Sequence, residues 1–112
     1  MSNENIRHDL ERGKLLELLV AGGRGWLTYK MLYHLMADAG EPVSPGSLTF
    51  HLEYLLGGGY IEVQRRREMP GFRTDRSYRQ GAPDEITQAR ITNKGIQLKD
   101  GRIEADPAVK FD

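Results

Sequence analysis

Residues 44–67 read SPGSLTFHLEYLLGGGYIEVQRRR, and they carry the clearest structural signals in the sequence. Ser44 is a favourable helix N-cap, and Pro45 suits the first helical position because its missing N–H would have no partner there. One face of this helix carries Leu48, Leu52, Leu55 and Leu56. Gly57–Gly59 stops the helix, and an alternating strand follows from Tyr60 to Arg66. The stretch therefore predicts a helix that leads directly into a β-hairpin rich in arginine.

A first helix is expected upstream, over about Ile6–Val20. Its buried face would carry Leu15, Leu16, Leu18 and Leu19. Ile6 and Leu10 fall on nearly the opposite side of the helical wheel, and Gly13 between the two sets argues against one continuous helix. Two interpretations stay open. The first turn is frayed and packs back onto the domain, or Ile6 and Leu10 face the partner chain of a homodimer.

A second helix is expected after a short bridging strand. Gly22–Gly25 ends the first helix, Trp26–Thr28 forms the strand, and the Thr28 hydroxyl caps the new helix. Gly40 suits the position just past its end. The apolar stripe of this helix is Leu32, Leu35, Met36 and Ala39. Two helices of about ten residues with a short turn between them predict a helix-turn-helix.

The remaining residues predict the second half of the hairpin. Met69–Gly71 is a turn signal, and Arg76–Arg79 is a short strand within the hairpin. A return strand is expected over about Ile86–Thr92, with Ala89 and Ile91 facing inward. Thr92 then caps a short helix. We expect one domain over residues 1–100 and an acidic, irregular tail over 101–112.

The composition bounds the class of protein. With 112 residues the chain is long enough for one domain, and the absence of cysteine excludes disulfides, thiolate metal sites and cysteine nucleophiles. No apolar run approaches the roughly 18 residues of a membrane span, and the polar first residues lack the apolar core of a signal peptide. We expect a cytoplasmic protein without a membrane partner.

Charge is distributed unevenly along a chain whose net charge is zero. The segment 65–79 holds six arginines against Glu68 and Asp75, a net charge of +4, whereas residues 100–112 carry −2. A solvated loop would explain the arginines, but a basic hairpin on an otherwise acidic protein is better explained by a polyanionic partner. We also consider the hypothesis that the acidic tail folds against the hairpin and masks it.

No pattern of a known catalytic or metal site occurs in the sequence. The chain has no H-E-x-x-H motif and no P-loop, and its glycine runs lack the preceding strand and following helix of a phosphate cradle. His8, His34 and His51 are well separated, and we interpret them as surface or core-edge residues. We therefore expect neither an enzyme nor a cofactor or metal.

The order of these elements resembles the winged helix-turn-helix regulators of the MarR, PadR and ArsR type. The segment LEYLLGGGYI at 52–61 is similar to their L-x-x-L-x-x-x-G-Y/L-I passage from recognition helix into wing, and ARITNKG at 89–95 is similar to their Y-R-L-T-x-K-G exit. The resemblance covers residues 6–98. The small size and the arginine-rich wing also resemble small winged-helix proteins of Mu-like prophages.

The resemblance implies an α+β fold, a three-helix core with a β-hairpin wing, and double-stranded DNA as partner. Two departures matter. Fourteen residues follow Leu98, too few for the long C-terminal dimerisation helix of MarR and PadR proteins. The cysteine or histidine cluster of metal-sensing ArsR proteins is also missing.

The implied function is a small DNA-binding protein and transcriptional regulator. The recognition helix 44–57 would enter the major groove, with the wing 65–79 on the backbone or in the minor groove. Phe50 would touch a thymine methyl, while Glu53 would either accept from cytosine or repel phosphate. Because the helix has no arginine or lysine, the wing would supply most affinity. The candidate DNA-binding residues are Ser44, Gly46, Ser47, Thr49, Phe50, Glu53, Tyr54, Arg65, Arg66, Arg67, Arg73, Arg76 and Arg79.

A protein-interaction adaptor without DNA binding is the alternative. Winged helices also serve as protein adaptors, and an exposed Phe50 and Tyr54 beside Glu53 would suit such a surface. In that case the arginines of the hairpin would meet an acidic protein.

Overall fold

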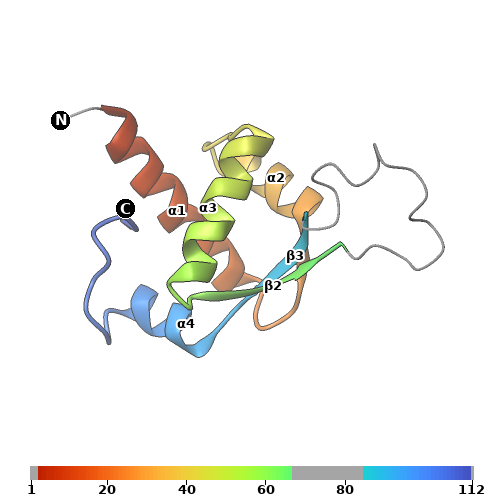
Figure 1. Cartoon of the computed structure of the whole chain (residues 1–112). Helices are drawn as coiled ribbons and strands as arrows, with labels where there is room; N and C mark the ends of the chain where they lie inside the picture. Colours follow the sequence, from red (N-terminus) through yellow and green to blue (C-terminus); the bar gives the residue numbers. More distant parts are fainter. Residues whose placement is uncertain (1–2, 67–84, 112) are drawn as a thin grey trace, which may run out of the picture.

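The chain forms a helix, a short strand, two more helices, two strands and a last helix, in that order (Figure 1). The computed structural model describes residues 3–66 and 85–111. Its elements are α1 (Asn3–Ala21), β1 (Leu27–Thr28), α2 (Tyr29–Asp38), α3 (Pro45–Gly57), β2 (Ile61–Arg65), β3 (Ile86–Ile91) and α4 (Asn93–Asp100).

The three strands form one antiparallel sheet in the order β1-β3-β2. Ile61 pairs with Ile91, and Val63 pairs with Ala89. As predicted, Ala89 and Ile91 face inward and are buried. The register then shifts between Gln64 and Arg65, so that Arg65 pairs with Ile86. This irregularity turns Ile86 to the buried face as well.

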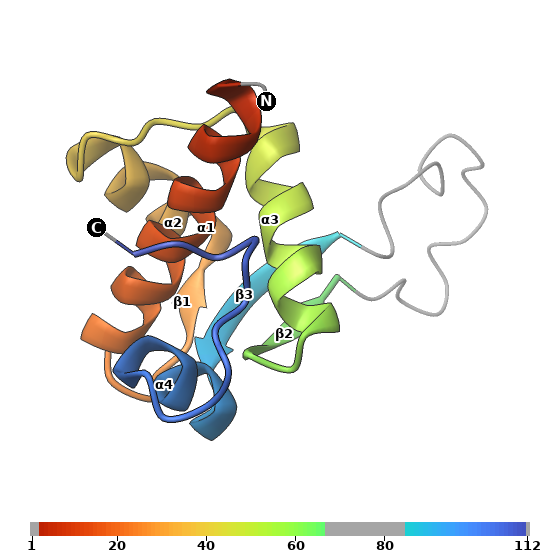
Figure 2. The same ribbon diagram turned by 90° about the vertical axis from the view of Figure 1, so that its left-hand side faces the viewer.

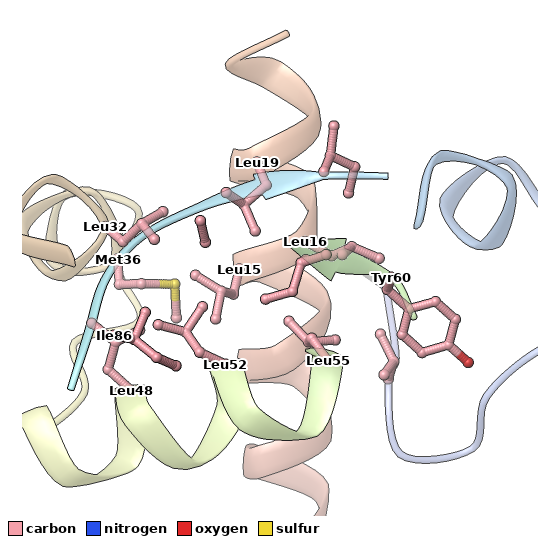
Figure 3. Close-up of a cluster of buried hydrophobic side chains, with 14 of the residues drawn as sticks. Leu15, Leu16, Leu19, Leu32, Met36, Leu48, Leu52, Leu55, Tyr60 and Ile86 are labelled. Atoms are coloured by element: carbon pink, nitrogen blue, oxygen red, sulfur yellow. The ribbon is translucent and has the colours of Figure 1, made fainter. Parts of the chain in front are cut away.

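The core lies between the first three helices and one face of the sheet (Figure 3). Leucines at helical spacing from α1 and α3 meet beneath β3, together with two side chains of α2. Each such side chain, when fully buried, stabilises the fold by roughly 1.5–3 kcal/mol. The buried apolar side chains of α1, α2 and α3 are Leu15, Leu16, Leu19, Leu32, Met36, Leu48, Leu52 and Leu55.

Three predicted helix caps are confirmed. The hydroxyls of Thr28, Ser44 and Thr92 each accept a backbone N–H at 3.1 Å, from Met31, Ser47 and Gly95 respectively. Gly40 follows α2 with φ +86°, the left-handed conformation that glycine adopts most easily. The hydroxyl caps fix where three helices begin.

The predicted first helix is confirmed, and α1 runs without a break through Gly13, where the backbone of Lys110 occupies the space that a side chain would need. One expectation about the second helix was wrong. Ala39 does not join the buried stripe of α2, because the helix ends at Asp38 and Ala39 is exposed.

The C-terminal segment 102–111 crosses α1 and reaches the end of α3 (Figure 2). Val109 is buried, and the Lys110 N–H donates to the carbonyl of Asp9 at 3.0 Å. The hypothesis that the tail masks the hairpin stays untested, because residues 67–84 lie outside the described residues. Within the described part of the chain, the tail contacts α1, α3 and Tyr60.

This arrangement is a winged helix-turn-helix: α2 and α3 form the helix-turn-helix, and β2 and β3 form the base of the wing. The predicted turn Met69–Gly71 and the predicted strand Arg76–Arg79 lie outside the described residues. None of the described helices combines the length and the hydropathy that a membrane crossing requires.

Candidate nucleic-acid interface

The outer face of α3 is the surface that a winged helix presents to DNA. Phe50 is 57% exposed and Tyr54 is 37% exposed on this face. Gly46 and Glu53 are exposed beside them, and Ser47 is half-buried. The core leucines occupy the opposite face, so the helical period itself turns these residues outward.

Two hydroxyls near the start of α3 are engaged within the protein. The Ser44 hydroxyl caps the helix. Thr49 is half-buried, and its Oγ1 lies 3.2 Å from the hydroxyl of Tyr29. The Tyr29 hydroxyl donates to the carbonyl of Pro45, so Thr49 donates to Tyr29. Thr49 therefore holds the start of α3 against α2.

Glu53 on α3 and Arg65 on β2 form a bidentate salt bridge. The two terminal guanidinium nitrogens of Arg65 each donate to a different carboxylate oxygen of Glu53, at 2.9 Å. The hydrogen bonds from Arg65 hold the pKa of Glu53 below its ordinary value. The first arginine of the wing is thus tied to the outer face of α3.

The other wing arginines are less constrained or lie outside the described residues. Arg66 lies 3.4 Å from Glu85, and both side chains are about half exposed. A pair of this kind contributes roughly 0–1 kcal/mol and exchanges readily with solvent. Arg67, Arg73, Arg76 and Arg79 lie outside the described residues.

Asp106 of the C-terminal segment receives two tyrosine hydroxyls. Tyr54 donates at 3.0 Å and Tyr60 at 2.9 Å, while the N–H of Ala108 donates at 2.9 Å. Burial opposes ionisation of Asp106, but these three donors outweigh it and place its pKa below the ordinary value. Burial, reinforced by Asp106, raises the pKa of Tyr60 to about 12.

A buried polar cluster joins α1 to α3 directly behind this face. His51 is fully buried, and its Nε2 lies 2.9 Å from Glu11. The Arg12 guanidinium lies 3.2 Å from Nδ1 of His51 and donates to the carbonyl of Ala108 at 2.7 Å. The Arg12 guanidinium also stacks on the ring of Tyr54, with its central carbon 4.8 Å from the ring centroid. One arginine therefore links α1, α3 and the C-terminal segment.

The sequence contains a signal for the burial of His51. This residue stands three residues after Leu48 and four before Leu55, so the helical period places it among the core leucines. The interpretation of His51 as a surface or core-edge residue was therefore wrong. Its burial is compatible with a polar ring because Glu11 and Arg12 satisfy both ring nitrogens.

The remaining predicted positions lie on α1. Ile6 is 40% exposed, and Leu10 is half-buried. Among the described residues, no three His, Asp or Glu side chains are grouped so as to hold a metal ion.

Comparisons with known proteins support the fold. No protein-family model matches the chain, and no curated protein matches its sequence. A solved structure of a transcriptional regulator from Clostridium thermocellum is similar, with a TM-score of 0.55 and 19% sequence identity. The match covers 91% of this chain and 84% of that one. At this identity the similarity shows a shared fold.

Proposed function

We propose that the protein is a DNA-binding transcriptional regulator. Helix α3 enters the major groove, and the wing lies along the backbone or the minor groove. The observation that carries this proposal is the outer face of α3, which stands uncovered at Phe50 and is joined to the base of an arginine-rich wing through Glu53 and Arg65. A transcriptional regulator with the same fold agrees with it.

The α3 face offers few hydrogen bonds to bases. Phe50 contacts a thymine methyl, and Ser47 donates to a base edge or a phosphate. Glu53 is bound to Arg65 in the free protein, and this pairing limits its repulsion of phosphate. We therefore assign modest sequence selectivity to α3.

The wing supplies most of the affinity. Guanidinium groups bind phosphate through two parallel hydrogen bonds and also enter narrow minor grooves. Because Arg65 is occupied by Glu53, the phosphate contacts fall first to Arg66 and the four arginines beyond it. If four arginines reach phosphates, log K falls with log[salt] at a slope of about −3.6.

A homodimer through α1 fits this function. Dimeric regulators match two-fold symmetric DNA sites, and Ile6 with the half-buried Leu10 offers an apolar contact on the helix that begins the domain. Sedimentation of the wild-type protein and of I6E would test it. A wild-type dimer that I6E turns into a monomer supports the contact, and a monomeric wild type overturns it.

Fluorescence anisotropy against a mixed-sequence duplex, from roughly 50 to 200 mM salt, tests DNA binding. The double variant R66A/R67A should make the salt slope shallower by about 1.8. Each arginine that no longer neutralises a phosphate reduces the magnitude of the slope by about 0.9. R24A removes an exposed arginine next to Glu62 and Arg90, away from α3, and should leave the slope unchanged. Absence of wild-type binding at ~50 mM salt would refute the proposal.

The adaptor function remains the second candidate, because one observation favours it. Phe50 and Tyr54 border an open cavity of about 440 Å³ between α1, α3 and Pro107, which has room for a side chain from a protein partner. A stable hetero-complex recovered after nuclease treatment, together with no DNA binding, would favour the adaptor.

A further inference from the structure

Carboxylates hold two hydrogen-bond donors of the α3 face. Glu53 binds the guanidinium of Arg65, and Asp106 binds the hydroxyl of Tyr54. Arg65 lies at the base of the wing, which the proposed function places on the phosphate backbone, and Tyr54 lies on the face of α3 that enters the groove between the two backbones. We propose that Glu53 and Asp106 mask this face, occupying in the free protein the positions that two backbone phosphates take in the complex. The inference rests on the proposed function and adds regulation to the same site.

The geometry of the first pair suits such an exchange. Arg65 offers Glu53 two parallel N–H groups at 2.9 Å, the same fork that recognises phosphate. The Glu53 side chain is 44% exposed and that of Arg65 is 33% exposed, so a phosphate can approach from solvent. Binding then replaces one anion by another on the same guanidinium group.

The second pair belongs to a turn whose flanking residues face solvent. Ala105 and Pro107 on either side of Asp106 are exposed, whereas Val109 is buried. The carbonyl of Ala108 is held by Arg12, and the N–H of Lys110 is held by Asp9. Release of Tyr54 requires the Asp106 carboxylate to turn away, which also breaks its hydrogen bonds from the Tyr60 hydroxyl and the Ala108 N–H. Arg12 and Asp9 still hold the segment from Ala108 onward.

Both contacts act against DNA in the same direction. Each masked donor must leave its carboxylate before it meets a phosphate, and the carboxylate that loses its donor then repels the phosphate. The pairs therefore lower the affinity for any duplex, independently of its sequence. Neutralising either acid should tighten binding, whereas neutralising an acid elsewhere should have little effect at moderate salt.

The first test is E53Q, assayed by anisotropy on the mixed-sequence duplex. Glutamine keeps the size of the side chain and removes the negative charge that holds Arg65, so affinity at ~50 mM salt should rise about two- to fivefold. The salt slope should steepen by about 0.9 as Arg65 gains a phosphate. E62Q is the matched control, because Glu62 pairs with Arg90 and alternates with Ile61 and Val63, placing it on the solvent face of the sheet.

A double-mutant cycle tests the second pair. D106N should raise affinity about two- to fivefold in the protein that carries Tyr54, and less in a Y54F background, where no hydroxyl is released. D100N, at the exposed end of α4, removes an equal charge away from the cluster. Circular dichroism establishes that each variant is folded, and E53Q tests the masking by itself if D106N unfolds.

The outcomes separate the two proposals. If the wild type binds DNA and both variants equal their controls, the masking is wrong and the DNA-binding function stands. If the wild type binds DNA and E53Q and D106N each bind more tightly than their controls, both proposals are supported. If neither the wild type nor E53Q/D106N binds at ~50 mM salt, both are overturned.

Discussion

The imidazole of His51 is held between Glu11 and Arg12 in a single tautomer. Arginine only donates hydrogen bonds, so Nδ1 of His51, 3.2 Å from the Arg12 guanidinium, must be the acceptor. Nε2 then carries the proton and donates to Glu11 at 2.9 Å. Burial, aided by the charge of Arg12, lowers the pKa of His51 despite the hydrogen bond to Glu11. The ring is therefore predominantly neutral at pH 7 in the folded protein.

Acid should destabilise the fold through His51. The unfolded chain has the ordinary histidine pKa of 6.5 and the folded protein a lower one, so the unfolded state binds more protons between these values. The free energy of unfolding should fall as the pH drops below about 6.5 and level off below the folded pKa. Urea titrations between pH 7.5 and 5 would measure this. H51Q should lose that part of the pH dependence, while the control H34Q, which changes an exposed histidine, should keep it. Equal pH profiles for H51Q and the wild type would contradict the assignment.

Arg12 and Arg7 provide a matched comparison on one helix. Arg12 is buried and joins α1 to His51 and to the C-terminal segment, whereas the Arg7 side chain is 66% exposed and pairs with Glu11 at 3.3 Å. R12Q should lower the free energy of unfolding by about 3–5 kcal/mol, because it leaves buried polar groups without partners. R7Q should cost no more than about 1 kcal/mol. If urea unfolding gives similar losses of free energy for R12Q and R7Q, the cluster around Arg12 does not contribute specially to stability.

Most of the fold follows from local patterns in the sequence. The caps at Thr28, Ser44 and Thr92 depend on residues three positions apart, and the leucine stripe of α3 follows the helical period. The Gly57–Gly59 stop and the alternation after Tyr60 place the helix-to-strand passage within a few residues. Such signals are predictable from the sequence because they do not depend on the rest of the chain.

The details of the candidate site depend on partners distant in sequence. His51 meets Glu11 across 40 residues, and Asp106 meets Tyr54 across 52. No local pattern indicates which carboxylate will reach which tyrosine, because that choice is made by the packing of the C-terminal segment on α1. The sequence predicts an outward Tyr54 but not its hydrogen bond to Asp106.

Gly13 should be intolerant of alanine although it lies inside a helix. Alanine normally stabilises a helix relative to glycine by about 1 kcal/mol. At Gly13, however, a Cβ would overlap the backbone carbonyl of Lys110. G13A should therefore destabilise the protein, by about 1–3 kcal/mol. At Gly57 a Cβ meets nothing within 4 Å, so G57A should be neutral or stabilising by up to about 1 kcal/mol. Thermal unfolding of both variants measures the difference, and a stabilising G13A would show that the C-terminal segment does not pack on α1 in solution.

Phe50 should matter for binding and not for folding. Its ring is 57% exposed on α3, and Met31, 48% exposed on α2, is a matched control of similar exposure. F50A should change the free energy of unfolding by no more than about 0.5 kcal/mol, as most surface substitutions do.

On a duplex selected in vitro for tight binding, F50A should weaken affinity about fivefold or more, which is comparable to the effect of one mismatched base pair. Because no charge is removed, the salt slope should not change. M31A should leave both quantities unchanged. If F50A binds the selected duplex like the wild type, the outer face of α3 does not read DNA.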